Sequence, residues 1–366
     1  MQTMKILTIS DSFKGTLRSS EIGEIVTKYC KEKGFDATYI PISDGGEGFL
    51  ETVHYITHLP FYETEVSDPV FQKTIAKYLF DEVKKIAYVE LAEACGITKM
   101  KTLAPIQAST YGLGELILYI INKHAPKKVV LGLGGSATSD MGVGLLEACG
   151  VDFLDAYHFR LSKMNHAKLM QIRKIETKAF QKKIKHIEFI TLTDVTNAAF
   201  GKAGCIQAFA PQKGAKEEDL FLMKKNVLHF HHVTQDTLGS NITDFPGAGA
   251  AGGVGYTMKH YFGSSIQSGI EVLLDMMDFP HLVEASDIVI TGEGSFDAQS
   301  LKGKVISGIW KYHPKRLIVL CGKSEFLNPP FEVYPIVPTV ASFEDAIQSP
   351  KASLERLLES IPWDKK

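Results

Sequence analysis

Residues 128–144 read KVVLGLGGSATSDMGVG. The apolar run 129–131 predicts a short buried strand, which stops in glycines and small hydroxyl residues before an apolar helix that begins near Val143. Such a loop leaves backbone N–H groups near the positive end of a helix, an arrangement that binds anions such as phosphate. The alternative is a tight turn in which Ser139 or Asp140 caps the helix.

Four further clusters in the chain combine carboxylates with glycines or hydroxyl residues. They are DSFKGT (11–16), SDGGEG (43–48), LTDVTN (192–197) and TGEGSFD (291–297). Glycine loops and a lysine can take the charge of a phosphate, carboxylates can hold Mg²⁺, and a further carboxylate can orient an attacking hydroxyl. The set therefore favours phosphoryl transfer, although any single aspartate could instead form an Asx-turn or a helix cap.

The two ends of the chain share a pattern of strands that alternate with helices. Strands are predicted at 5–10 and 37–42 and again at 287–291, 317–320 and 334–340, with a last helix over 343–358. This alternation predicts parallel strands whose functional loops follow their carboxyl ends. We expect one doubly wound α/β domain with a flavodoxin-like strand order, whose switch point lies between the first strand and the strand at 287.

The middle of the chain has a different pattern. Three β-rich stretches at 62–66, 74–80 and 86–91 predict an antiparallel meander. Further elements are predicted as a helix over 111–122, strands at 129–131 and 187–192, a helix over 220–229, and loosely helix and loop over 155–185. We therefore expect two domains, with residues 1–60 and 281–366 forming the discontinuous flavodoxin-like domain and residues 61–280 inserted into it.

Composition excludes several classes of protein. A chain of 366 residues exceeds what one core usually supports. With 40 basic and 42 acidic residues the formal net charge is −2, so no field of one sign attracts nucleic acid or a membrane. No apolar run approaches the roughly 20 residues of a membrane span, and the N-terminus is too short for a signal peptide. The five scattered cysteines predict reduced thiols in a cytoplasmic protein.

Two nucleotide-binding patterns are incomplete. Gly247, Gly249 and Gly252 have the spacing of a dinucleotide fingerprint, but the polar segment before them is not a strand. The run Gly322-Lys323-Ser324 follows a strand, yet Leu317 occupies the position of the first P-loop glycine. We therefore expect neither a Rossmann cofactor site at the first nor a Walker A loop at the second.

The clusters together resemble bacterial glycerate kinases of class I. The matching segments are DSFKGTLRSSE (11–21), PISDGGEG (41–48), GLGGSATSDMGVG (132–144), DVTN (194–197), PQKGA (211–215), FPGAGAAGGVG (245–255), SGIE (268–271) and TGEGSFDAQSLKGK (291–304). The resemblance implies a flavodoxin-like domain with an inserted domain similar to the restriction-endonuclease fold. It also implies a kinase that uses ATP and Mg²⁺ to phosphorylate D-glycerate, with 2-phosphoglycerate favoured over 3-phosphoglycerate as the product.

For such a kinase we expect catalytic roles for Lys14, Asp44 and Asp194, with Asp44 or Asp194 as the base. Asp194, Glu293 or Asp297 would bind Mg²⁺. Lys14 and the backbone of residues 134–138 would contact phosphate or the substrate carboxylate. The expected contacts to substrate or phosphate are Asp11, Ser12, Gly45, Gly46, Gly134, Gly135, Ser136, Ala137, Thr138, Gly249 and Gly252.

Other functions stay open at this point. A nicotinamide-dependent oxidoreductase of a small 2-hydroxy acid would suit a doubly wound domain, but no glycine fingerprint follows the first strand. A kinase of another small sugar acid is a second alternative. A non-catalytic binding module is a third, although clustered carboxylates near a bound anion weaken binding unless a cation is present. The sequence is compatible with a monomer or a homodimer.

Overall fold

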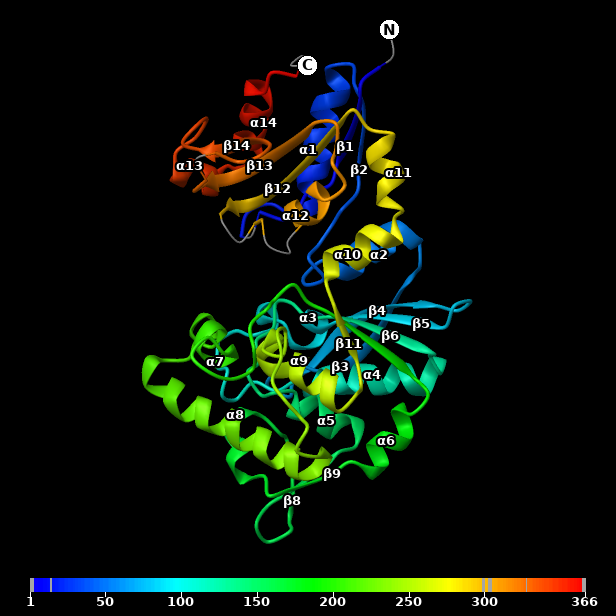
Figure 1. Cartoon of the computed structure of the whole chain (residues 1–366), viewed down its shortest axis with the longest axis vertical. Helices are drawn as coiled ribbons and strands as arrows, with labels where there is room; N and C mark the ends of the chain where they lie inside the picture. The colour runs from blue at the N-terminus through cyan, green and yellow to red at the C-terminus, as the bar shows by residue number, and fades with distance from the viewer. Residues whose placement is uncertain (1–2, 14, 298–299, 302–304, 327, 364–366) are drawn as a thin grey trace. The chain divides into compact units, whose positions relative to one another are not determined.

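The computed structural model describes residues 3–13, 15–297, 300–301, 305–326 and 328–363 (Figure 1). The chain forms two compact units. The first comprises Met1–Asp44, Glu51–Thr57 and Ser268–Lys366, and the second comprises Gly45–Leu50 and His58–Gln267. The return to the first unit thus falls at Ser268 and not near residue 281, because a helix that follows Ser268 packs within the first unit, where its Ile270 lies against Gly308.

The first unit is built on a five-stranded sheet in the order β14-β13-β12-β1-β2, with every neighbouring pair parallel. Its strands are β1 (Lys5–Thr8), β2 (Asp36–Tyr39), β12 (Ile288–Phe296), β13 (Leu317–Ser324) and β14 (Glu332–Val337). This is the flavodoxin-like order that the sequence predicts. Because β1 pairs directly with β12, with Ile6 opposite Ile288, the switch point also lies where we expected it.

Strands β12 and β13 are longer than predicted. We expected both to end before their glycines, which would make TGEGSFD a loop. Instead the parallel pairing of β12 with β13 continues to Phe296 opposite Ser324, and Phe296 is fully buried. Ladder hydrogen bonds and this buried ring hold the glycine-containing segment extended, against the low intrinsic strand preference of glycine.

Several helices belong wholly or in part to the first unit. They are α1 (Ser19–Glu32), α2 (Phe49–Thr57, which begins in the second unit), α10 (Gly269–Met276), α11 (Phe279–Glu284), α12 (Val305–Trp310), α13 (Phe343–Gln348) and α14 (Pro350–Ser360). Ile22 of α1 and Leu354 of α14 belong to one buried core. The single helix predicted over 343–358 is two helices, because Pro350 disfavours helical geometry at Ser349.

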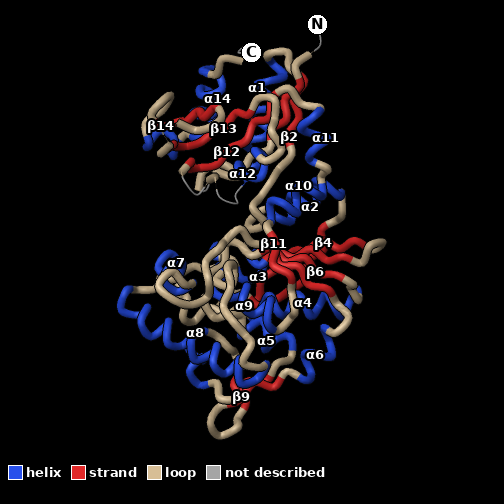
Figure 2. The backbone as a smooth tube through the Cα atoms, in the orientation of Figure 1, coloured by secondary structure: helices blue, strands red, loops and turns tan. Residues whose placement is uncertain are grey.

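The second unit is built on a six-stranded sheet in the order β11-β10-β6-β5-β4-β3 (Figure 2). Its strands are β3 (Phe61–Ser67), β4 (Lys73–Asp81), β5 (Ile86–Glu90), β6 (Lys128–Gly132), β10 (Glu188–Leu192) and β11 (Ser265–Gln267). The predicted antiparallel meander is confirmed in β3, β4 and β5, and the strands from β5 to β11 pair in parallel. The likeness of this unit to a restriction endonuclease stays a prediction.

A further, three-stranded sheet overlaps the region 155–185, which we assigned to helix and loop, and includes a strand just before it. It consists of β7 (Asp152–Leu154), β8 (Arg160–Leu161) and β9 (Lys174–Glu176), joined in the order β8-β7-β9. Strands of two or three residues are too short to carry a recognisable alternation. The helices of the second unit are α3 (Leu91–Cys95), η1 (Ile97–Lys99), α4 (Tyr111–His124), α5 (Val143–Cys149), η2 (His166–Gln171), α6 (Lys178–Ile184), α7 (Cys205–Phe209), η3 (Pro211–Lys213), α8 (Glu217–Leu238) and α9 (Ala250–His260).

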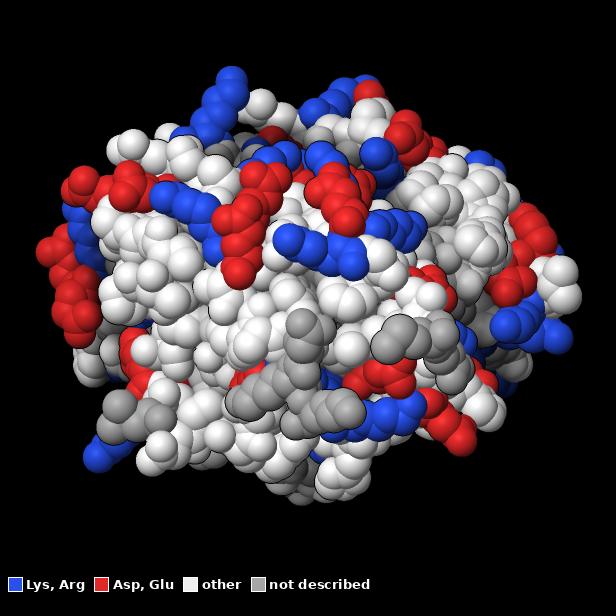
Figure 3. All heavy atoms as spheres, turned by 90° about the horizontal axis from the view of Figure 1, so that it is seen from above, with Lys and Arg blue, Asp and Glu red and all other residues white. Residues whose placement is uncertain are grey.

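The surface carries both signs of charge. On the face drawn in Figure 3, lysine and arginine side chains are interspersed with aspartate and glutamate, as the nearly balanced totals of 40 and 42 imply. Within the described ranges, no helix combines the length and apolar character required to cross a bilayer.

Candidate active site

The GGSAT loop (residues 134–138) follows the carboxyl end of β6, between the ends of β5 and β10. It is held from one side by the segment after α3: the Ala137 N–H donates to the carbonyl of Cys95 at 2.9 Å, and the Ile97 N–H donates to the carbonyl of Gly135 at 2.8 Å. Ser136 and Gly96 form the bridge between these two bonds. In such a pair the N–H of Ser136 points away from Gly96.

Gly45 and Gly46 lie directly against this loop. A Cβ atom at Gly134 would come within 2.3 Å of the Cα of Gly46, so the two backbones approach more closely than any side chain allows. Glu90, at the end of β5, fixes this segment by accepting the N–H groups of Gly48 at 3.3 Å and Leu50 at 3.2 Å. Burial raises the pKa of the Glu90 carboxyl to about 8.

Asp140 occupies the start of α5. The carboxylate is fully buried and accepts the N–H groups of Gly142 at 3.1 Å and Gly144 at 3.3 Å. Burial raises its pKa, and these hydrogen bonds oppose the shift. The expected cap at Ser139 or Asp140 is not found, because the N-cap residue of α5 is Gly142 with a φ of +75°; Asp140 contributes by accepting the Gly144 N–H in the first turn. In the GGSAT loop the Ala137 N–H is already bonded to the carbonyl of Cys95.

The glycine-rich 245–253 segment packs on the same loop. Gly252 has a φ of +67°, and a Cβ atom there would lie 2.2 Å from the carbonyl oxygen of Thr138. The Met141 N–H donates to the carbonyl of Gly252 at 3.0 Å. Gly249 is equally close to another backbone, since its Cβ would lie 2.4 Å from the oxygen of Ala198. Close approach of backbones thus accounts for both glycines, and their contact with a ligand stays a prediction.

Asp194 follows β10 in a loop that is tied to the 245–253 segment. The carbonyl of Asn197 accepts the N–H groups of Gly247 at 3.2 Å and Gly249 at 2.9 Å. Asp244 completes the connection by accepting the N–H groups of residues 199 and 200 at 2.8 and 2.9 Å. The second unit therefore gathers one group of the predicted site residues at one edge of its sheet: Gly45, Gly46, Gly134, Gly135, Ser136, Ala137, Thr138, Asp194, Gly249 and Gly252.

Lys213 is a residue of this region to which our sequence reasoning gave no role. Its side chain is buried, with 4% exposed, and its Nζ donates to the hydroxyl of Ser136 at 2.7 Å and to the carbonyl of Thr138 at 2.6 Å. Burial lowers the pKa of this ammonium to about 8. The sequence signal was only its place in the PQKGA segment, from which burial cannot be predicted.

The first unit holds the other predicted site residues. Asp11 follows β1, and its N–H donates to the carbonyl of Gly292 at 3.1 Å; Glu293 lies within β12, where it pairs with Cys321 of β13. The Ser12 N–H donates to the Asp11 carboxylate at 2.7 Å. Asp44 follows β2 and Asp297 follows β12, so Asp11, Asp44 and Asp297 lie after parallel strands, whereas Glu293, which we expected in a loop, lies inside a strand. Lys14 lies outside the described residues.

The predicted carboxylates can supply only a small number of ligands to one Mg²⁺ ion. Glu293 lies within β12 and Asp297 directly follows it, and the extended strand from Glu293 to Phe296 alone spans about 10 Å at roughly 3.3 Å per residue. In the part of the chain that the structure describes, no three aspartate, glutamate, histidine or cysteine side chains are grouped to hold a metal. Mg²⁺ usually takes one or two protein carboxylates and completes its shell with phosphates and waters, which suits such a donor set.

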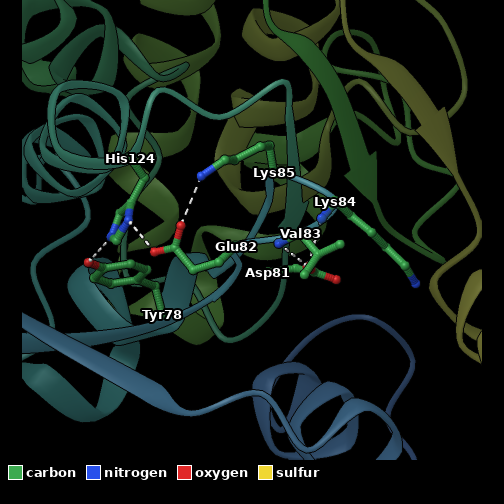
Figure 4. A network of polar contacts seen from close by, with 7 residues as sticks. All are labelled: Tyr78, Asp81, Glu82, Val83, Lys84, Lys85 and His124. Atoms are coloured by element: carbon green, nitrogen blue, oxygen red, sulfur yellow. Dashed lines mark hydrogen bonds and ion pairs between the residues drawn. The ribbon is translucent and has the colours of Figure 1, made fainter.

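A separate polar network lies at the opposite edge of the six-stranded sheet (Figure 4). The His124 ring lies 3.0 Å from the hydroxyl of Tyr78 and 3.4 Å from the Glu82 carboxylate, which also pairs with Lys85 at 2.9 Å. These residues surround the β4–β5 turn, before the amino end of β5. Because the GGSAT loop follows the carboxyl ends of the parallel strands, this network stabilises the hairpin and is no part of the site.

Parallel sheets that carry glycine loops and carboxylates at their carboxyl ends are typical of α/β enzymes that bind phosphorylated ligands. Comparison with known proteins gives the particular family. Residues 6–363 match the model of the glycerate kinase family, and the chain belongs to this family. It is therefore an ATP-dependent kinase of glycerate, and the oxidoreductase alternative falls away.

Similar proteins cover most of the chain. It is 35% identical over 315 residues to the glycerate kinase of Bacillus cereus, and the aligned part covers 84% of this chain and 81% of the relative. It is 33% identical over 327 residues to the glycerate 2-kinase of Escherichia coli, spanning 87% and 85%. A crystal structure described as a glycerate kinase 2 from Salmonella typhimurium LT2 matches with a TM-score of 0.78 at 28% identity, covering 98% of this chain and 96% of that one.

Proposed function

We propose that this kinase transfers the γ-phosphoryl group of ATP to D-glycerate to give 2-phosphoglycerate, with Mg²⁺ bound to the phosphates. The name of the Escherichia coli relative, glycerate 2-kinase, supports this position of transfer. The observation that carries the proposal is the convergence of the GGSAT loop, the Asp194 loop and the 245–253 segment at one sheet edge.

Phosphoryl transfer depends mainly on positioning and on neutralising charge, so a strong base is not required. In our proposal Lys14 and the backbone of residues 134–138 contact phosphate or the glycerate carboxylate, although the Ala137 N–H is already bonded to the carbonyl of Cys95. Asp44 or Asp194 orients the attacking hydroxyl. Mg²⁺, when bound to Asp194, Glu293 or Asp297, neutralises charge on the phosphates. The further proposed contacts to substrate or phosphate are Asp11, Ser12, Gly45, Gly46, Gly249 and Gly252.

The product identifies the position of transfer. We would incubate the purified enzyme with ATP, Mg²⁺ and D-glycerate and record phosphorus NMR with proton correlation. Coupling of the phosphorus to the single proton on C2 is expected. Coupling to the two protons on C3 would replace our assignment with 3-phosphoglycerate. Parallel assays of ADP release with tartronate and simple sugars test the alternative of another sugar-acid kinase.

The Gly135→Ala variant tests the GGSAT loop. Gly135 has a φ of +62°, and a Cβ atom there would lie 3.4 Å from Ala92, an ordinary contact, so the cost to folding is the left-handed backbone alone, about 1 kcal/mol. Gly263→Ala is the matched control, because φ is +65° and nothing lies within 4 Å. We expect Gly135→Ala to raise KM for ATP or for glycerate about tenfold, and the control to change neither. Unchanged KM for both substrates would remove the loop from the site.

A further inference from the structure

Lys213 lies against the GGSAT loop from a distant part of the sequence. It ends the short helix η3, and its ammonium joins two points of the loop, the hydroxyl of Ser136 and the carbonyl oxygen of Thr138. Gly252 packs on the same Thr138 carbonyl. Lys213 therefore sets the conformation of the loop at the place where the 245–253 segment meets it.

The two hydrogen bonds do not by themselves explain why a charged side chain is buried at position 213. Both acceptors are neutral, and a buried ammonium is costly unless it is compensated. The carboxylate whose charge acts on it is Asp140, whose oxygens already accept hydrogen bonds from Thr110, Gly142 and Gly144. An uncharged side chain could serve as a spacer at lower cost. A buried positive charge beneath a loop of backbone donors suits an anion bound on that loop.

We infer that Lys213 is a positioning residue for the anionic substrate: its ammonium fixes residues 136–138 and adds positive charge beneath the GGSAT loop. The inference rests on the proposed function of that loop. The anionic group is either a phosphate of ATP or the carboxylate of glycerate, and separate KM values for the two substrates distinguish these sources.

The pH dependence follows from the surroundings of Lys213. Among the described residues, the charged or titratable groups that act on it are the Cys205 thiol and Asp140, and burial raises the pKa of that thiol to about 12. Burial lowers the pKa of Lys213 to about 8, so its charge is lost as the pH rises through this value. Both substrate anions stay about nine-tenths ionised or more between pH 7 and 9, as model phosphate and carboxyl pKa values imply (about 6 and about 4). We therefore expect KM of the bound anion to rise above pH 8.

The experiment compares the intact enzyme with Lys213→Met and Lys213→Arg. We expect Lys213→Met to raise KM for one substrate at least tenfold at pH 7 with a smaller change in kcat, and to remove the rise in KM between pH 7 and 9. Lys213→Arg, which keeps the charge, should recover part of the loss. An unchanged KM in Lys213→Met, or a pH profile that persists in it, would overturn the inference.

Two further measurements separate the possible failures. Gly135→Ala reports on the loop alone: if it shifts KM while Lys213→Met does not, the role of Lys213 fails and the proposed loop survives. If neither variant shifts KM, the loop proposal itself fails. Should Lys213→Met not fold, calorimetric titration of the unmodified enzyme with ATP and with glycerate at pH 7 and 9 decides, because equal affinities at both pH values for both ligands contradict the inference.

Discussion

The carboxylate of Asp140 accepts both hydrogen-bond donors of Thr110: its Oδ2 lies 2.9 Å from the backbone nitrogen and 2.9 Å from the hydroxyl. That hydroxyl in turn accepts the N–H of Leu145 at 2.9 Å. The pair therefore links the residue before α4 to the first turn of α5, and both side chains are fully buried. The path of the chain directly after the GGSAT loop depends on this pair.

The first prediction concerns stability. Asp140→Ala leaves several buried donors without their acceptor, and we expect it to lower the free energy of unfolding by about 3 kcal/mol. Asp140→Asn should lose less, because its amide oxygen still accepts. Asp155→Ala is the control, since Asp155 also accepts two N–H groups at 2.9 Å but in the β7–β8 turn near the surface. Urea unfolding measures all three, and equal losses for Asp140→Ala and Asp155→Ala would contradict the prediction.

The second prediction concerns Gly252. Gly252→Ala places a methyl group 2.2 Å from the Thr138 oxygen at a φ of +67°, so the loop and the 245–253 segment must separate. We expect a loss of at least about 3 kcal/mol, against about 1 kcal/mol for left-handed backbone alone. Gly263→Ala has the same backbone strain in open space and measures that smaller cost. Similar midpoints of thermal unfolding in the two variants would show that close packing at Gly252 is unimportant.

Much of the fold could be predicted from local patterns. The alternation of strands and helices at the two ends was sufficient to predict the strand order, because parallel strands joined by helices permit few arrangements. The extension of β12 through Gly292 and Gly294 could not be predicted, since it depends on pairing with β13, where the partner of Gly292 is Leu320, 28 residues later. The sheet of β7, β8 and β9 was missed for the related reason that its strands are stabilised by tertiary contacts and not by their own sequence.

The candidate site, like the fold, has features that could be predicted from the sequence and features that could not. Clusters of glycines and acids at strand ends mark the loops, because the geometry of parallel sheets brings carboxyl ends to one edge. What the sequence could not separate is a glycine that faces a ligand from one that faces another backbone, as at Gly249 and Gly252. Lys213 was missed because its burial is a property of the folded chain.

The third prediction is a pH dependence of stability from Glu90. Burial raises its folded pKa to about 8 from a usual 4.5, so the folded chain holds this proton more tightly. The associated stability is complete below pH 4.5 and is lost as the pH rises through 8. Glu90→Gln keeps an acceptor for Gly48 and Leu50 without a charge. We expect the Tm of the variant to exceed that of the original chain increasingly between pH 5 and 8; a constant difference would exclude Glu90 as the source.

The fourth prediction gives Lys213 opposite effects on stability and on binding. Its folded pKa lies below the usual value of 10.5, so the stability that it contributes is present above pH 10.5 and is lost as the pH falls through 8. Relative to Lys213→Met, the original chain should therefore gain stability between pH 8 and 10, while its affinity for the anion falls. Urea unfolding of both proteins across this range measures the difference between their free energies of unfolding. The buried thiols titrate in both proteins, so their contribution cancels in this difference. A difference that does not change with pH would contradict the prediction.

The last prediction separates the proposed base from the proposed metal ligands. When a carboxylate that binds Mg²⁺ is removed, a higher concentration of the ion restores part of the activity. When a residue that orients the hydroxyl is removed, it does not. If Glu293 or Asp297 binds the metal, its variant, Glu293→Gln or Asp297→Asn, should need a higher Mg²⁺ concentration for half-maximal activity. At saturating Mg²⁺ that variant should recover near-native kcat. If Asp44 is the base, Asp44→Asn should lower kcat by about 10²- to 10⁴-fold at every Mg²⁺ concentration.

The Asp194→Asn variant shows whether Asp194 is a Mg²⁺ ligand, with Asp44 as the base, or is itself the base. Recovery of Asp194→Asn at high Mg²⁺ would make it a ligand and leave Asp44 as the base, and a loss of kcat that Mg²⁺ does not repair would make Asp194 the base. The Asp244→Asn variant is the control for the fold of this loop, because Asp244 accepts N–H groups of residues 199 and 200 and has no proposed role in the reaction. Near-native turnover of Asp194→Asn without added Mg²⁺ would remove this residue from the mechanism altogether.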